Sequence, residues 1–422
     1  MLSGYMKNKV KIFIASIMPG IFIIGYNVGT GSVTSMSKAG ANFGFDLLWA
    51  VLLSCMITYY LILKFSKYTM VTRQTFIQGV KKQIHPALAI GMIIPLSLVI
   101  IAALIGLLGV VSNILEAWST TISDSGFSAI WWAIVIAWLL YLLLWNGSYA
   151  QFEKFLAILV AIMGSAFIAT MFINFPSIKE LASGLIPKIP EIAQGSDNNP
   201  MVIVAGLVGT TVSVFTLIIR SQIIKETGWK IQDAAKQKRD ALISATMMFV
   251  ISAAVLITAA TTLHLQGIKM NSVVEMIPLL EPIAGKAALS VFTLGILAAG
   301  LSSHLPNLLI IPWLIIDYRE EPRDTRTPRN RSIMGILTLI STLGVAFSIK
   351  PVFLLLLSQA SIAIILPVSI GSLFYLTSNK KLMGTSSNKA LDIIILSLIM
   401  AFSMYVSVLG IKGVFIDIFH HL

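Results

Sequence analysis

The sequence predicts an all-α polytopic membrane protein. Three observations support this prediction: the composition, the recurring apolar runs and the placement of the basic residues. Of the 422 residues, 57% are hydrophobic and only 11% are charged, which is far from the composition of a soluble domain. Apolar runs of about 18 or more residues recur along the chain, and runs of that length are typical of helices that span a bilayer. Basic residues concentrate in alternate connecting segments, as the cytoplasmic loops of a membrane protein require.

Eleven transmembrane helices are expected, joined by segments too short to hold a soluble domain. Residues 1–422 are therefore expected to form a single transmembrane domain. The first apolar run is not followed by a small-residue cleavage site, so we expect it to be a span and not a removed signal. The expected spans are 12–36, 45–66, 87–113, 128–145, 152–174, 201–225, 241–264, 287–316, 332–349, 352–376 and 391–415.

The distribution of basic residues predicts the orientation. With the N-terminus inside, 22 of the 30 lysines and arginines belong to the cytoplasmic side and seven to the outer side. We therefore expect an integral protein of the plasma (inner) membrane, with a cytoplasmic N-terminus and an outside C-terminus. The net charge of +12 then matches anionic lipid headgroups. Nucleic acid is not an expected partner, because the basic residues are spread over separate loops without aromatic interleaving.

The first span contains a break at Val28-Gly29-Thr30-Gly31-Ser32. Two glycines inside a membrane helix weaken it and free backbone carbonyls and amides. Lipid cannot satisfy those groups, so such a break persists only where it lines a cavity or a binding site. The first span therefore indicates a transporter.

The sixth span is also unusual, because it holds Gly209, Thr210, Thr211, Ser213 and Thr216 within a short stretch. Spans one and six begin two halves of five spans, which would have opposite orientations. Paired irregular helices at corresponding positions of inverted halves point to a central binding site. Alternatively, the hydroxyls bond back to carbonyls of their own helix or pack against neighbours. The repeats would cover 12–174 and 201–376, with 391–415 as an added span.

Three further polar side chains lie within predicted spans. The amide of Gln359 needs a partner at membrane depth, which a neighbouring helix or a ligand could supply. Pro367 is expected to bend or break the same helix. His304 is either a proton carrier or a neutral imidazole that is hydrogen-bonded between helices. Arg220 either lines an inner vestibule or extends to the cytoplasmic surface.

Several functional classes are not expected. All 18 aspartates and glutamates fall in loops or near the ends of spans. The chain shows no nucleophile with a base, no metal-ligand spacing and no phosphate-binding Gly-Lys loop, so neither an enzyme, a cofactor nor an ATP-driven pump is predicted. The single cysteine, Cys55, is expected to be a small packing residue.

Several segments resemble the Nramp family of divalent-metal transporters. Leu357-Ser358-Gln359 and the stretch Leu376-Thr377-Ser378-Asn379-Lys380-Lys381-Leu382-Met383-Gly384 look like the family's span ten and the loop after it. Ala299-Gly300-Leu301-Ser302-Ser303 resembles its span eight, and residues 39–54 resemble the end of span one and the start of span two. The resemblance covers essentially the whole chain. It implies the LeuT-type fold, a 5+5 inverted repeat with spans one and six broken.

The chain departs from the family pattern where the metal would bind. The family's Asp-Pro-Gly-Asn falls on Gly29 to Ser32, so the carboxylate and the amide are missing. Its Met-Pro-His falls on Ser213, Val214 and Phe215, and a later histidine falls on Arg220. Only Gln359 keeps a ligand-type side chain. Without a carboxylate at position 29, proton coupling by the family's route is unsupported, and His304 and Arg220 are the candidates for proton or pathway residues.

The resulting hypothesis is a secondary transporter of divalent metal ions that works by alternating access with an altered site. A magnesium-like ion that keeps several waters would tolerate neutral ligands best. Gln359 and the backbone of Gly29 and Ser213 would hold the metal. The alternatives are a transporter of a small organic solute or anion on the same fold, and a non-transporting sensor or scaffold. The complete predicted site is Gly29, Thr30, Gly31, Ser32, Thr210, Ser213, Thr216 and Gln359.

Overall fold

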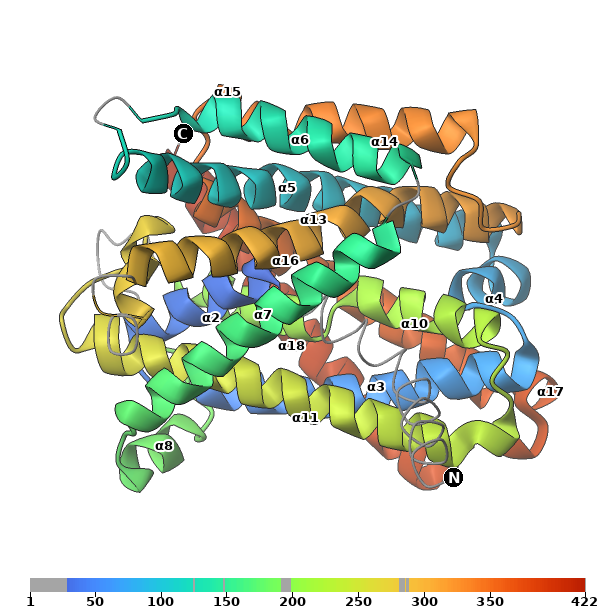
Figure 1. The fold of residues 1–422 in the computed structure, drawn as a ribbon. Helices are drawn as coiled ribbons and strands as arrows, with labels where there is room; N and C mark the ends of the chain where they lie inside the picture. The colour runs from blue at the N-terminus through green and yellow to red at the C-terminus, as the bar shows by residue number, and fades with distance from the viewer. Residues whose placement is uncertain are drawn as a thin grey trace, which may run out of the picture.

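Long helices lie side by side in the computed structural model of the chain, and α7 crosses its neighbours obliquely (Figure 1). The structure describes residues 29–123, 126–146, 149–190, 199–280, 285 and 288–421. Within these ranges the secondary structure is helical and contains no strand, as predicted. The elements in chain order are α2 (Thr30–Phe43), α3 (Leu48–Thr72), α4 (Phe76–Gln83), α5 (Pro86–Ser119), α6 (Ala129–Asn146), α7 (Tyr149–Ile173), α8 (Ile178–Gly184), α9 (Pro200–Thr211), α10 (Val214–Glu226), η1 (Ile231–Asp233), α11 (Ala234–Ala259), η2 (Ala260–His264), η3 (Val274–Leu280), α13 (Ala288–Arg319), α14 (Pro328–Ser341), α15 (Leu343–Ala346), α16 (Pro351–Ser378), α17 (Lys380–Met383), η5 (Gly384–Ser386) and α18 (Ala390–His421).

The helices follow the predicted spans. Every predicted span from 45–66 onward contains a helix or a pair of helices. In the described part of the chain, seven helices are long and apolar enough to cross a membrane, and shorter apolar helices cover Ala129–Trp145 and Ala161–Ile173. The first part of the span predicted at 12–36 lies outside the described residues. The total of eleven spans therefore stays a prediction, while the all-α membrane fold is confirmed.

Four helices begin with a proline. The backbone amides in the first turn of a helix have no partner within the helix, so a proline there removes no hydrogen bond. These prolines are Pro86, Pro200, Pro328 and Pro351. In α16 a further proline, Pro367, lies inside a helix that continues unbroken to Ser378. Of the two expectations for Pro367, a bend or a break, the continuous helix excludes the break. Neighbouring helices and side chains can satisfy the backbone groups that a proline frees in a membrane helix.

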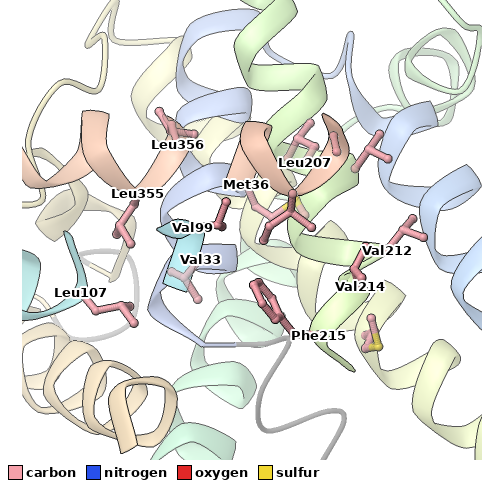
Figure 2. Packing of buried hydrophobic residues seen from close by; sticks show 14 of the residues in the cluster. Val33, Met36, Val99, Leu107, Leu207, Val212, Val214, Phe215, Leu355 and Leu356 are labelled. Atoms are coloured by element: carbon pink, nitrogen blue, oxygen red, sulfur yellow. The ribbon is translucent and has the colours of Figure 1, made fainter. Parts of the chain in front are cut away.

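Helix α16 lies at the centre of the packing. It contacts α9, α5 and α18, while α13 packs on α5 and α7, and α11 packs on α2 and α3. Figure 2 shows the core where these helices meet, with Val33 of α2, Leu107 of α5, Phe215 of α10 and Leu355 of α16 directed toward one region. This arrangement brings segments that are distant in the sequence around the predicted site.

Candidate functional site

The sixth predicted span is broken, as its sequence indicates. Helix α9 ends at Thr211, and α10 begins at Val214. Between them, Val212 has φ −91° and ψ 40°, and Ser213 has φ −55° and ψ 115°, both outside the helical range. A carbonyl at the end of α9 is satisfied from outside, because the hydroxyl of Thr58 in α3 lies 2.8 Å from the Thr211 carbonyl oxygen. The break therefore belongs to the packed interior.

The start of α2 corrects the predicted break in the first span. Gly29 is extended, with φ −78° and ψ −176°, and its carbonyl accepts a hydrogen bond of 3.0 Å from the Val33 amide. Thr30, Gly31 and Ser32 form the first helical turn of α2 and are not part of an irregular segment. Val28 and the residues before it lie outside the described residues. The local reason is that the extended backbone is confined to Gly29, the residue before the first turn of α2.

A cavity of ≈60 Å³ lies where α2, α5, the α9–α10 break, α13 and α16 meet. Of the eight predicted site residues, five line this cavity and three do not. The three are Gly29, Thr30 and Thr216; the Thr30 hydroxyl is directed toward the Ile296 carbonyl oxygen, 3.5 Å away. None of the described residues that line the cavity carries a charge. The five that line it are Gly31, Ser32, Thr210, Ser213 and Gln359.

Gln359 connects the cavity wall to α2 and α9. Its side-chain oxygen accepts a hydrogen bond from the Ser35 hydroxyl of α2. A Cβ added at Gly31 would lie 2.4 Å from Gln359 Nε2, and one added at Gly209 would lie 1.9 Å from the Gln359 carbonyl oxygen. Both helices can approach this closely only because glycine occupies those positions. Gln359 therefore packs between helices and also lines the cavity, and its role as a ligand stays a prediction.

The predicted site omitted three polar residues that line the cavity. Ser303 and Asn307 come from α13, and Ser358 precedes Gln359 in α16. The sequence does contain a signal for the first two. Ser303 and Asn307 are four residues apart, and positions four apart lie on the same face of a helix. The apolar part of the wall includes Phe215 and Leu355, which point into the region shown in Figure 2.

Arg220 is inside the protein and does not extend to a membrane surface. Its side chain is fully buried and lies 2.6 Å from Asp240 of α11, which is also fully buried. Its Nε donates a hydrogen bond of 3.0 Å to the Ser66 hydroxyl of α3. The alternative in which Arg220 extends to the surface was therefore wrong. Arg220 is also absent from the cavity wall.

His304 lies in the middle of α13 and is only 2% exposed. Neither of its ring nitrogens has a hydrogen-bond partner in the described part of the chain. The expected hydrogen bond between helices is therefore not seen there. His304 does not line the cavity, although its neighbour Ser303 does.

The described residues contain no group of three or more histidine, cysteine, aspartate or glutamate side chains that could hold a metal. A larger hollow of ≈760 Å³ lies at the other end of α2 and includes Asp46, Glu180 and His264. Asp46 already pairs with Lys188 at 2.7 Å, and none of the predicted site residues lines this hollow. The polar groups that line the cavity at the break between α9 and α10 are therefore all uncharged in the described part of the chain.

The chain is similar in sequence to known proteins. A family model described as natural resistance-associated macrophage protein-like matches residues 20–412. The natural resistance-associated macrophage protein 2 homolog of Dictyostelium discoideum is 24% identical over 441 aligned positions, which cover 99% of this chain but only 66% of that protein. The divalent metal cation transporter MntH of Yersinia pestis (strain Pestoides F) is 24% identical over 385 positions, covering 89% of each chain.

Solved structures show the same fold. A mutant of the manganese transporter from Eremococcus coleocola superimposes with a TM-score of 0.75 at 18% identity, covering 97% of this chain and 87% of that one. The inward-facing conformation of Mhp1 gives a TM-score of 0.57 at 14% identity, covering 94% of this chain and 88% of that one. At these identities the likeness establishes the architecture alone, which is the LeuT-type fold that the resemblance to the Nramp family implies.

Proposed function

The chain belongs to the natural resistance-associated macrophage protein (Nramp) family, and we propose that it is a secondary transporter that moves a divalent metal cation across the membrane by alternating access. The observation that carries the proposal is the cavity at the break between α9 and α10, which is lined by Ser32, Thr210, Ser213 and Gln359. Their hydroxyl and amide oxygens are the ligand types that hard cations accept.

The size of the cavity favours an ion. One water needs about 10–15 Å³ of such space, so ≈60 Å³ holds an ion with a few waters. Pockets for drug-sized organic ligands measure about 300–1,000 Å³. A cation that keeps part of its hydration shell avoids much of the cost of entering a site without a carboxylate, and magnesium retains its waters more firmly than other biological dications.

Flux measurements test this proposal. Purified protein in liposomes should take up Mg²⁺ down its gradient, and Mn²⁺, Fe²⁺ and Cd²⁺ should compete to different extents. Protein-free liposomes are the control. The proposal fails if none of the four ions moves under any ion or proton gradient.

One observation favours the second candidate, a transporter of a small organic solute or anion. Gly31 and Ser32 bring the first turn of α2 to the cavity, and the amides at a helix N-terminus stabilise negative charge. Thermal-shift screening against metal ions and against amino and organic acids separates the candidates. Stabilisation by metal ions alone would refute the second candidate, and stabilisation by acids alone would refute the first.

We also propose the topology of the chain. The placement of basic residues supports a plasma (inner) membrane protein with a cytoplasmic N-terminus and an outside C-terminus. Residues 1–422 would then act as one transporter domain without enzymatic activity, with inverted repeats at 12–174 and 201–376. In a Cys55→Ser background, Ser272→Cys and Lys238→Cys should react with an impermeant maleimide from opposite sides of the membrane. Labelling of both from one side would contradict this orientation.

Proton coupling is a further part of the proposal, with His304 as its candidate because the imidazole is buried beside the cavity-lining Ser303. An imposed pH gradient should then change the rate of metal uptake, and His304→Gln should abolish that response without abolishing uptake. An unchanged pH response in His304→Gln would exclude His304 as the proton carrier.

A further inference from the structure

Helix α13 contributes two polar side chains to the cavity, in addition to those expected from the broken spans. Ser303 and Asn307 lie four residues apart on one face of α13, and both line the cavity. They are 5% and 4% exposed, so neither is a solvated surface residue. Neighbouring Ser302 differs, because its hydroxyl donates a 3.0 Å hydrogen bond to the Ala299 carbonyl of its own helix and it does not line the cavity.

Two other polar side chains of the wall, Gln359 and Ser358, are engaged within the protein. The Gln359 side-chain oxygen accepts from Ser35, and its nitrogen faces Gly31. The Ser358 hydroxyl donates a 2.7 Å hydrogen bond to the Leu355 carbonyl oxygen. In contrast, the Ser303 hydroxyl is buried without a hydrogen-bond partner in the described residues, which is costly unless something in the cavity satisfies it.

Asn307 is the only carboxamide side chain besides Gln359 among the described residues that line the cavity. An amide oxygen is a good ligand for a hard cation, because side-chain carbonyls of asparagine and glutamine are among the oxygen ligands of Ca²⁺ and the amide group has a large dipole of about 3.5 D. The site has no carboxylate among its lining residues, so each amide oxygen matters more to the binding of a dication than it would beside an anionic ligand.

We propose that Ser303 and Asn307 of α13 are cation-binding residues, and that Asn307 sets the selectivity of the site for a partly hydrated divalent cation. The inference rests on the proposed function and deepens it. In this arrangement the ion is held between the broken spans and α16 on one hand and α13 on the other. The neutral amide of Asn307 replaces part of the electrostatic stabilisation that a carboxylate would give.

The test compares matched variants in proteoliposomes with Mg²⁺ as the probe. Ser303→Ala and Asn307→Ala should each raise the KM for Mg²⁺ by about 3- to 10-fold, the effect of losing one polar interaction. Ser302→Ala is the matched control for the first, since its hydroxyl is used within the helix. Asn113→Ala of α5, which lines a separate hollow, is the control for the second. Both controls should keep the wild-type KM.

Asn307→Asp gives a readout that a merely structural role would not produce. An added carboxylate should lower the KM for Mg²⁺ and sharpen the discrimination of Mg²⁺ over Na⁺, measured by competition. Size-exclusion profiles and melting temperatures show whether each variant folds. If Asn307→Ala does not fold, Ser303→Ala and Asn307→Asp test the cation-binding role of α13. Unchanged KM and selectivity in the folded variants would overturn the role of α13. An absence of any dication uptake by the wild-type protein would instead overturn the proposed function.

Discussion

Gln359 combines two tasks that its sequence could not separate. Its side chain ties α16 to α2 through Ser35, and it also faces the cavity. The close approach of α2 and α9 at Gly31 and Gly209 fixes the position of this side chain. A residue that is held on two sides presents a ligand atom without first losing side-chain freedom, which favours binding.

Replacing either of two cavity residues by leucine should abolish transport while the protein still folds. Gln359→Leu and Ser213→Leu each remove a polar group from the wall, and leucine in place of Ser213 also fills the space. We expect metal uptake to fall at least about tenfold, because about 1.4 kcal/mol of lost stabilisation has that effect. The measurement is the initial rate of Mg²⁺ uptake by folded protein.

Ser361→Leu provides the comparison on the same helix. Its hydroxyl bonds to the Leu357 carbonyl oxygen at 2.8 Å and does not line the cavity, so uptake should remain near the wild-type rate. Wild-type rates in both Gln359→Leu and Ser213→Leu would show that the cavity is not the transport site.

At the scale of elements, a buried ion pair joins α10 to α11. Arg220 and Asp240 are both fully buried at 2.6 Å, and Ser66 of α3 adds a hydrogen bond to the arginine. The pair therefore holds the half-helix after the break against two neighbouring helices. Breaking a buried pair by removing one partner leaves an uncompensated charge and costs about 3–5 kcal/mol.

Arg220→Leu alone should therefore destabilise the protein strongly, because Asp240 would keep its charge in a buried position. The double variant Arg220→Leu with Asp240→Leu should recover most of the lost stability, because both charges are then removed. Melting temperatures in detergent measure both effects. If the double variant is no more stable than Arg220→Leu, the pair does not carry the stability of this contact.

The predicted elements were accurate where the local sequence decides the backbone. The break in the sixth span follows from its glycine and hydroxyl residues, and the structure places it at Val212 and Ser213. The exact start of α2 was not predictable, because glycines at positions 29 and 31 indicate an irregular backbone without showing at which residue the helix begins. The local pattern could not decide whether Pro367 bends or breaks its helix, because neighbouring helices can keep a helix continuous through a proline.

At the scale of the whole molecule, composition and repeated apolar runs predicted the fold class, since lipid leaves few options for the backbone. The site was only partly predictable. The sequence singled out Ser303 only as part of the segment that resembles span eight, and only the packing of α13 shows that Ser303 and Asn307 line the same cavity as Gln359. Arg220 was misplaced because its partner Asp240 lies on another helix, and the burial of both depends on how α10 and α11 pack.

The uncharged wall of the cavity has an electrical consequence. A membrane potential does work of about 2.3 kcal/mol per elementary charge per 100 mV, so a dication that crosses 100 mV gains or loses about 4.6 kcal/mol. The described residues that line the cavity add no countercharge, so the loaded step carries the full charge of the ion. The return of the empty site would move no lining charge.

Voltage should therefore act on the loaded carrier and hardly at all on the empty one. With an inside-negative potassium diffusion potential, Mg²⁺ uptake should accelerate, and in His304→Gln, where no proton is coupled, the charge moved per ion should be two. Asn307→Asp should make the return step voltage-sensitive as well, because a fixed negative charge then travels with the empty site. Uptake that is indifferent to the imposed potential would contradict this. In such a carrier the resting potential of the cell would supply energy for accumulating the cation, in addition to any energy from a coupled proton.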